Sequence, residues 1–326
     1  MNLIELFDTL TFPEGNGKLF NAFQIPGYPN FRIAVDFEGN PIILLSIVNV
    51  VRDLSLKNFR LKYLLLEQNI ECKITENGES SLQTFTVIKF ISVDRNLQEY
   101  FLRIAETLIK TLSNKSSQSQ IIDTLNKFVE VFRALTDTPT NTVHGLWSEL
   151  FLIDNSVNVS SLLYYWHSIP EEKFDFNSGP EKIEVKSNSN FERIHTFSSE
   201  QLNPPPGTQV LIASVFVRQA NTGKNIQQLV DSITSKIQYD SELTFKLNNL
   251  VCMTLGNSLE QAILIKFDYN IAKDSLQFYR HQDVRKIEEI YIPDEVSAVK
   301  FTSDLITLKS IKPTEIKMSG LLFDAI

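Results

Sequence analysis

Cysteine and long hydrophobic runs are both scarce in this chain of 326 residues. The two cysteines, Cys72 and Cys252, lie far apart and outside any Cys-x-x-Cys spacing, so the sequence supports neither a disulfide framework nor a thiolate zinc site. The most apolar segment, residues 41–51, is about half the ~20 residues that a membrane-spanning helix needs, and the first ten residues lack the basic start of a signal peptide. We therefore expect a cytoplasmic protein without membrane contacts.

An excess of positive charge is also absent. Lysine and arginine number 31 against 39 aspartates and glutamates, which gives a formal net charge of -8. Residues 1–139 carry 14 basic and 16 acidic groups (14 - 16 = -2), and residues 140–326 carry 17 and 23 (17 - 23 = -6). Because affinity for nucleic acid depends on cationic contacts with phosphate, any DNA contact must be local.

Several common catalytic motifs are missing. The sequence has no Gly-x-Gly-x-x-Gly, no phosphate-binding Gly-Lys-Ser/Thr loop, no Gly-x-Ser-x-Gly and no His-Glu-x-x-His. His144, His167 and His281 lack ligand-like spacing, and we expect surface or capping roles for them. The aromatic residues Tyr164–Trp166 are expected in the core or at a domain interface, with base stacking as the alternative.

The pattern of apolar residues changes along the chain. Short β-rich runs separated by turn residues predict a β-rich recognition or assembly domain over residues 1–94, with hairpin turns at Gly39–Asn40 and Asn77–Gly78. Apolar residues then recur at helical spacing, which predicts a helical connector over residues 95–138. The segment around Pro139 is the predicted boundary.

The second half has mixed α/β order, which predicts a core domain over residues 139–270 and a β-containing extension over residues 271–326. The elements expected in the core are a helix over 143–154, a hairpin over 172–187, a strand over 208–218, a helix over 225–238 and a strand over 262–269.

One constellation in the predicted hairpin carries chemistry. Asp175 is followed nine positions later by Glu184 and then by Lys186, and residues 177–180 form a turn. Glu184 and Lys186 share one face of a strand because they are two residues apart. A turn centred on Ser178–Gly179 would place Asp175 opposite Lys182 and so on that same face, whereas an odd loop would place it on the other.

Two carboxylates at close range repel each other, and a divalent cation allows both to stay ionised. Oxygen ligands favour Mg²⁺, for which Mn²⁺ can substitute, and a lysine beside the metal can offset charge as a phosphodiester is attacked. The alternative is a solvated hairpin face with a cross-strand ion pair worth only ~0.2–1 kcal/mol.

The Asp-x8-Glu-x-Lys pattern, with GLWSELFLI upstream and EVKSNSNFERIHTFSSEQL downstream, resembles a bacterial family of PD-(D/E)XK (restriction endonuclease-like) proteins linked to restriction and phage-defence loci. The detailed match covers roughly residues 143–238. The resemblance implies an α/β (α+β) fold, in which a mixed sheet flanked by helices forms the core beside the N-terminal β-rich domain. Phe174 stands where the motif has its proline.

The resemblance also implies that Glu149, from the first helix of the core, is an accessory carboxylate of the site. Glu149 falls on the shoulder of an apolar stripe, so a surface position remains the alternative. Arg193 and His195 alternate along the next predicted strand and are candidate phosphate contacts, or else part of its exposed polar face. Gln201 resembles a motif glutamine near the active centre and has capping-box spacing from Ser198.

The leading interpretation is a Mg²⁺-dependent DNA endonuclease in which Asp175, Glu184 and Glu149 bind metal and Lys186 is the catalytic cation. Its partners would be DNA and a methyltransferase or motor ATPase subunit, and a homodimer is expected for cutting two strands. The alternative is a non-catalytic or partner-activated subunit whose β domain docks onto that partner. RNA cleavage is disfavoured only by the resemblance.

Overall fold

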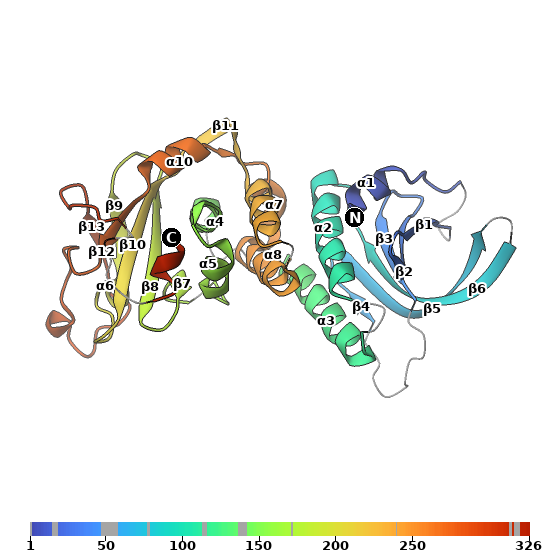
Figure 1. Cartoon of the computed structure of the whole chain (residues 1–326), viewed down its shortest axis with the longest axis horizontal. Coiled ribbons are helices and arrows are strands. Elements are labelled where there is room, and N and C mark those ends of the chain that lie inside the picture. The colour runs from blue at the N-terminus through green and yellow to red at the C-terminus, as the bar shows by residue number, and fades with distance from the viewer. Residues whose placement is uncertain are drawn as a thin grey trace. The chain divides into compact units, whose positions relative to one another are not determined.

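The computed structural model describes residues 2–14, 19–46, 58–76, 79–112, 116–135, 142–170, 172–238, 240–312, 315 and 320–326. The chain divides into two compact units, Met1–Asp137 and Thr138–Ile326 (Figure 1). Residues 136–141, where the boundary was predicted, lie outside the described part of the chain. None of the helices in the described ranges combines the length and the apolar character that crossing a membrane requires.

The first unit is built around an antiparallel sheet with the strand order β1-β2-β3-β6-β5-β4. Its elements are α1 (Leu3–Asp8), β1 (Asn21–Ile25), β2 (Tyr28–Val35), β3 (Pro41–Leu45), β4 (Phe59–Arg60), β5 (Leu64–Glu76), β6 (Glu79–Phe90), α2 (Arg95–Thr111) and α3 (Gln118–Ala134). Figure 1 shows α2 and α3 against one side of this sheet. The helices predicted as a connector therefore pack as part of the first unit.

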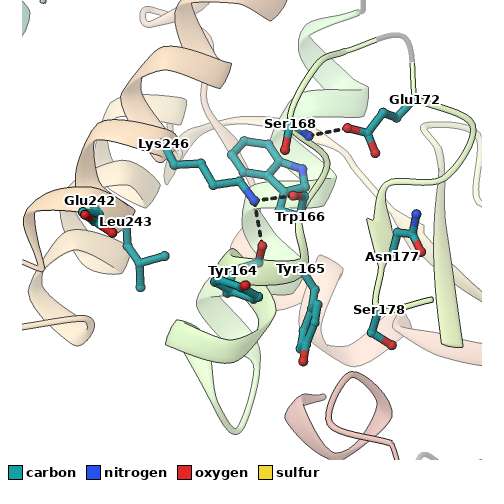
Figure 2. A pocket seen from close by; sticks show the side chains of 10 residues that line it. All are labelled: Tyr164, Tyr165, Trp166, Ser168, Glu172, Asn177, Ser178, Glu242, Leu243 and Lys246. Atoms are coloured by element: carbon teal, nitrogen blue, oxygen red, sulfur yellow. Dashed lines mark hydrogen bonds between the residues drawn. The ribbon is translucent and has the colours of Figure 1, made fainter. Parts of the chain in front are cut away.

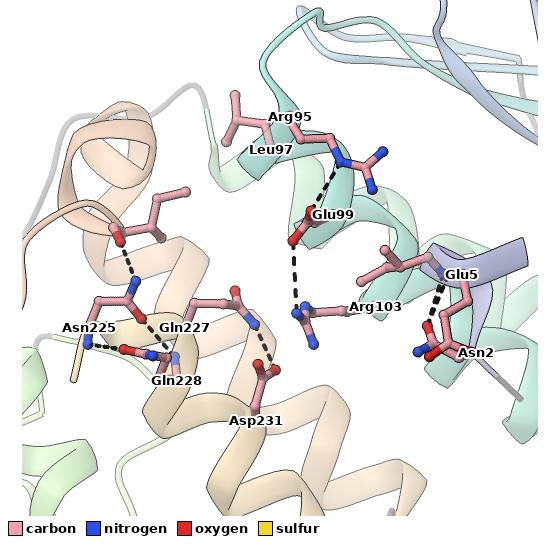
Figure 3. Close-up of polar contacts among 12 residues, drawn as sticks. Asn2, Glu5, Arg95, Leu97, Glu99, Arg103, Asn225, Gln227, Gln228 and Asp231 are labelled. Carbon is pink, nitrogen blue, oxygen red and sulfur yellow. Dashed lines mark hydrogen bonds and ion pairs between the residues drawn. The ribbon is translucent and has the colours of Figure 1, made fainter. Parts of the chain in front are cut away.

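Aromatic packing joins these helices to the sheet. Phe90 of β6 stacks on Phe101 of α2 at 5.0 Å between ring centroids and meets Phe132 of α3 edge-on at 5.7 Å. Helix α2 begins where the Asp94 carboxylate accepts a hydrogen bond from a backbone N–H in its first turn. On its outer face, Arg95 donates to Glu99 at 3.0 Å (Figure 3).

The turn predicted at Gly39–Asn40 connects β2 to β3, and Gly39 adopts a φ of +83° there, a conformation that glycine adopts without strain. The other predicted turn, Asn77–Gly78, lies outside the described residues.

The second unit contains a mixed four-stranded sheet and a separate two-stranded one, in the orders β12-β10-β8-β7 and β13-β9. Its elements are α4 (Val143–Asn155), α5 (Val159–Tyr165), β7 (Phe176–Asn177), β8 (Glu181–Asn188), β9 (Ile194–Ser198), α6 (Ser199–Leu202), β10 (Gln209–Phe216), β11 (Gln219–Lys224), α7 (Ile226–Lys236), α8 (Ser241–Leu255), α9 (Leu259–Ala262), α10 (Tyr269–Ser275), β12 (Gln277–Arg280) and β13 (Lys300–Asp304), with short 3-10 helices at Gly256–Ser258, Glu289–Tyr291 and Phe323–Ala325.

Strands β8 and β10 are parallel and central, with antiparallel β7 and β12 at the edges. Figure 1 shows α4 and α5 on one side of this sheet and the β9–β13 pair on the other. A mixed sheet between helices and a second β layer confirms the predicted α/β (α+β) class. Helix α7 begins with a capping box, in which Asn225 and Gln228 exchange side-chain and backbone hydrogen bonds (Figure 3).

The strand predicted over residues 262–269 is wrong. Helix α9 ends at Ala262, and the buried Phe267 makes only isolated bridges to Gln219 and Lys224. Ala262, Ile263 and Phe267 are buried by packing against neighbouring elements whereas Leu264 is exposed, and periodicity alone does not distinguish such a segment from a strand.

The C-terminal segment closes back onto the hairpin of β7 and β8. The fully buried Glu181 accepts hydrogen bonds from the backbone N–H groups of Leu322 and Phe323, each at 3.1 Å. A Cβ atom at Gly320 would lie 1.8 Å from the Glu181 carboxylate, so only glycine fits this approach.

Candidate active site

The hairpin that carries Asp175 and Glu184 turns at Gly179–Pro180. Ser178 donates its backbone N–H to the Glu181 carbonyl, and Gly179 has a φ of +91°, as the first central residue of a type II′ turn requires. Residue pairs therefore sum to 359, with Asn177 opposite Lys182. The predicted opposition of Asp175 and Lys182 is wrong by two residues, because the turn is centred one residue later than expected.

A shift of two residues leaves strand parity unchanged, so Asp175 lies on the predicted face. The observed pairing, continued by one position, places Asp175 opposite Glu184. The Asp175 Oδ2 atom accepts a hydrogen bond from the backbone N–H of Val185 at 2.6 Å. This bond fixes the Asp175 carboxylate against the backbone of β8 at Val185, the neighbour of Glu184.

Lys186 is held over the same face by two oxygen atoms. Its Nζ lies 2.8 Å from Glu184 Oε1 and 3.3 Å from Gln201 Oε1, and it also lies 5.1 Å from the centre of the Phe197 ring. The Lys186 side chain is only 19% exposed. Gln201 Oε1 also accepts the Ser198 N–H at 3.0 Å, so the predicted capping residue positions the lysine as well.

Glu149 turns inward from α4 and is 4% exposed, so the alternative of a surface carboxylate is wrong. Its Oε2 atom accepts the indole N–H of Trp166 at 2.8 Å and lies 3.0 Å from His167 Nε2. An antiparallel bridge between Trp166 and Phe176 places this segment beside the hairpin. The backbone N–H of His167 then donates to the Asp175 carbonyl at 2.8 Å.

The resulting cluster has the donor set of a divalent-metal site. One ligand atom each from Glu149, His167 and Asp175 lies within 4.8 Å of the other two. Glu184 is 4% exposed, and its Oε2 atom is buried without a hydrogen-bond partner. An unpaired buried carboxylate oxygen is costly, and a bound cation would satisfy it. The residues therefore fit a divalent cation.

Electrostatics lead to the same conclusion. Burial raises the pKa of Asp175 well above its usual range, and the charges of Glu184 and Glu149 raise it further. Burial also raises the pKa of Glu184, an effect that Lys186 partly offsets. These carboxyl groups are therefore difficult to ionise together unless positive charge is added among them.

Arg193 and His195, the predicted phosphate contacts, lie in the interior. They are 8% and 4% exposed, and both bind the Ser214 hydroxyl, at 2.8 Å from Arg193 Nη1 and 2.8 Å from His195 Nε2. Burial, with the nearby charges of Lys186 and Arg193, lowers the pKa of His195 to about 4. Their burial and internal partners argue against direct phosphate contact, and the outward face of β9 is formed by Ile194 and Thr196.

Sequence reasoning missed His167 and Trp166 as members of this cluster. Both were expected in structural positions, because His167 lies eight positions before Asp175 and no ligand-like spacing is visible. The sequence could have indicated only their position between the end of α5 and the hairpin. The bridge to Phe176 and the hydrogen bond from the His167 N–H to the Asp175 carbonyl place the two residues beside the carboxylates.

A pocket of about 520 Å³ is lined in part by Trp166 (Figure 2). Its lining includes Tyr164, Tyr165, Glu172 and Lys246. Lys246 of α8 donates to the backbone carbonyls of Tyr164, at 2.7 Å, and Trp166, at 2.5 Å, and burial lowers its pKa to about 8. Lys246 thus holds the end of α5, from which Trp166 and His167 extend.

Comparison with known proteins adds one finding. A family model described as "Putative PD-(D/E)XK family member, (DUF4420)" matches residues 3–306. No curated protein and no solved structure matches the chain. Because the match extends over both units, the chain belongs to this PD-(D/E)XK family, DUF4420.

Proposed function

We propose that this protein is a divalent-metal-dependent DNA endonuclease that hydrolyses phosphodiester bonds in a cytoplasmic bacterial restriction or phage-defence system. The observation that carries the proposal is the buried Glu184 carboxylate, which pairs Lys186 through one oxygen and leaves the other unpaired. Membership in a PD-(D/E)XK family supports nuclease chemistry in general.

Asp175, Glu184 and Glu149 would hold the cation, with Mg²⁺ or Mn²⁺ as the candidates. Bound there, a divalent cation supplies a water of lowered pKa and stabilises negative charge on the attacked phosphate. Asp175 is fixed for this role by the Val185 N–H, and Glu149 by the Trp166 indole.

Lys186 would contact the reacting phosphate through its remaining ammonium proton. Its Nζ is anchored by Glu184 Oε1 and Gln201 Oε1, so a third N–H is free to point elsewhere. A cation already fixed at this position stabilises charge that develops on the phosphate without reorganising. Gln201 is a positioning residue in this scheme, because it acts through Lys186.

Weak intrinsic affinity for DNA favours a partner. The second unit carries 17 basic and 23 acidic groups over residues 140–326, and the two predicted phosphate contacts are buried. A methyltransferase or motor ATPase subunit that binds DNA would supply the missing affinity, with the first unit acting in recognition or assembly. A partner-activated or non-catalytic subunit of such a system is therefore the second candidate, and a homodimer would serve two-strand cleavage.

The decisive experiment incubates the purified full chain with methylated and unmethylated plasmid and with single-stranded RNA, each in Mg²⁺, Mn²⁺ or Ca²⁺. We expect DNA cleavage with Mg²⁺ or Mn²⁺, none with Ca²⁺, and a loss of at least ~100-fold in Lys186→Ala. Lys182→Ala is the matched control, because Lys182 lies on the same strand and donates to Asn177 instead of to the site.

Full nicking by Lys186→Ala would assign the activity to another site or a contaminant. A parent chain that binds the cation and cleaves nothing would favour the partner-activated subunit. RNA cleavage without DNA cleavage would correct the substrate while leaving the metal site in place.

A further inference from the structure

The protons around His167 pose a problem that a metal ion solves. His167 Nδ1 lies 2.9 Å from the carbonyl oxygen of Ile169, which can only accept, so Nδ1 carries a hydrogen. In the neutral ring Nε2 then presents a lone pair, and it faces Glu149 Oε2 at 3.0 Å. Two acceptors face each other there, unless a cation lies between them or one further proton is carried by the ring or by the Glu149 carboxyl group.

A further proton on either group would answer only part of the problem. It would pair His167 with Glu149, and it would leave Glu184 Oε2 buried without a partner and Asp175 among other carboxylates. A divalent cation near the three ligand atoms of Glu149, His167 and Asp175 separates the facing acceptors and offsets the negative charge that Glu184 and Glu149 exert on Asp175. The cation is therefore the more complete solution.

The spacing also suits metal ligation. Two ligands at right angles around a cation with bonds of about 2.1 Å lie about 3.0 Å apart. The Nε2–Oε2 separation is 3.0 Å. The His167 ring is oriented by the hydrogen bond from Nδ1 to the Ile169 carbonyl, and its backbone is fixed by the N–H that donates to the Asp175 carbonyl. The Trp166 indole N–H orients the Glu149 carboxylate.

We propose that His167 Nε2 is a metal ligand and that this nitrogen makes the site prefer a divalent transition metal such as Mn²⁺ over Mg²⁺. The inference rests on the metal site of the proposed function and adds a ligand and a selectivity to it. Mg²⁺ is a hard cation that takes oxygen ligands, whereas imidazole nitrogen is a common ligand for first-row transition metals.

The experiment measures Mn²⁺ and Mg²⁺ binding to the full chain by calorimetry, together with pulsed electron paramagnetic resonance of bound Mn²⁺, which detects a directly bonded ¹⁴N nucleus. Two variants separate ligation from structure. His167→Asn keeps an N–H where Nδ1 donates and removes the ligand, and His167→Gln places an amide oxygen near Nε2. His144→Asn is the matched control, because that ring packs on Phe267 outside the cluster.

We expect a ¹⁴N coupling in the parent and in His144→Asn, and none in His167→Asn. Mn²⁺ affinity should fall at least ~10-fold in His167→Asn, which is the size of effect known for residues that only support metal ligands. His167→Gln should bind Mn²⁺ and Mg²⁺ with more similar affinities than the parent does, and circular dichroism should show both variants folded.

A parent that binds Mn²⁺ without ¹⁴N coupling would overturn the inference and would assign the contact to an imidazolium–carboxylate ion pair. A coupling that persists in His167→Asn would also overturn it, because the nitrogen ligand would then be another residue. Cleavage in Mg²⁺ under that result would leave the proposed function intact. A parent that binds neither cation would overturn both.

Discussion

Two aspartates, the buried Asp36 of the first unit and the half-buried Asp175 of the second, have opposite electrostatic environments. Asp36 of the first unit is 1% exposed, and it accepts the backbone N–H groups of Glu38 and Asn40, the Asn40 side-chain amide and the Lys89 ammonium. Burial alone would raise its pKa, but the bonds from Lys89 and Asn40 lower it overall. Asp175 of the second unit has one backbone donor and two acidic neighbours, and its pKa is raised.

Asp154 shows that the contrast does not arise from the second unit as a whole. It is 2% exposed and is bound by Lys236, Ser232 and Tyr269, so its pKa is lowered although burial opposes this. At Asp36 and Asp154 the buried carboxylate is therefore surrounded by donors. Asp175 and Glu184 each have one such donor, too few to compensate both negative charges, and this is typical of carboxylates at a functional site.

Removing the charge of Asp36 should give the largest change in stability. Asp36→Asn turns an amide toward Lys89 and Asn40, which leaves donors facing donors in a buried place. We expect the free energy of unfolding to fall by about 3 kcal/mol, as for other broken buried pairs. Chemical denaturation measures this loss. Asp8→Asn is the control, since Asp8 is 52% exposed in its ion pair with Arg95, and an equal loss there would remove the contrast.

Asp175→Asn should instead stabilise the cation-free protein at neutral pH, by a few degrees in Tm. A carboxyl group whose pKa is raised by folding destabilises the protein as pH rises from its ordinary pKa, near 4, to its folded pKa, because the unfolded chain loses the proton first. The gain should therefore be small near pH 4 and larger at pH 7.

The measurement is Tm at both pH values, with and without Mn²⁺. We expect Mn²⁺ to raise the Tm of the parent and to have little effect on Asp175→Asn. A variant that is less stable than the parent at pH 7 would mean that Asp175 is a structural carboxylate like Asp36, and the comparison would fail.

The sequence is informative about this site wherever the geometry is local. Asp175, Glu184 and Lys186 share a face because strand parity depends only on an even turn, and an error of two residues in the register did not change that result. The inward position of Glu149 was not decided by the helical pattern, because residues 146–154 of α4 are all buried. Tertiary packing on several sides of the helix removes the contrast on which periodicity depends.

Long-range contacts account for what the sequence could not predict. The alternation of Arg193 and His195 along β9 was visible, but the burial of that face depends on Ser214, which comes from another strand. His167 joins the cluster only through the pairing of its segment with the hairpin. The spacing of side chains along one strand carries no information about which distant strand or loop will cover it.

The smallest effect concerns Lys246, which binds the backbone carbonyls of Tyr164 and Trp166. Lys246→Met removes two hydrogen bonds to backbone carbonyls and also the destabilisation that comes from burying an ammonium group, so these changes partly cancel. We expect a shift of a few degrees or less in Tm at pH 7, and a few-fold loss of cleavage, because the segment that carries His167 becomes less constrained.

The pH dependence identifies the cause. Burial lowers the pKa of Lys246 to about 8 from an ordinary 10.5, so the buried charge destabilises the folded protein below about pH 8, and this destabilisation is relieved as pH rises toward 10.5. Below pH 8, Lys246→Met lacks the two hydrogen bonds and also lacks the destabilising buried charge. At pH 10 the buried lysine of the parent is neutral, so the parent no longer carries that destabilisation either. The Tm of the parent relative to Lys246→Met should therefore rise between pH 7.5 and pH 10. A constant difference across that range would show that the ammonium is not desolvated, and Lys246 would then act as an ordinary exposed cap of α5.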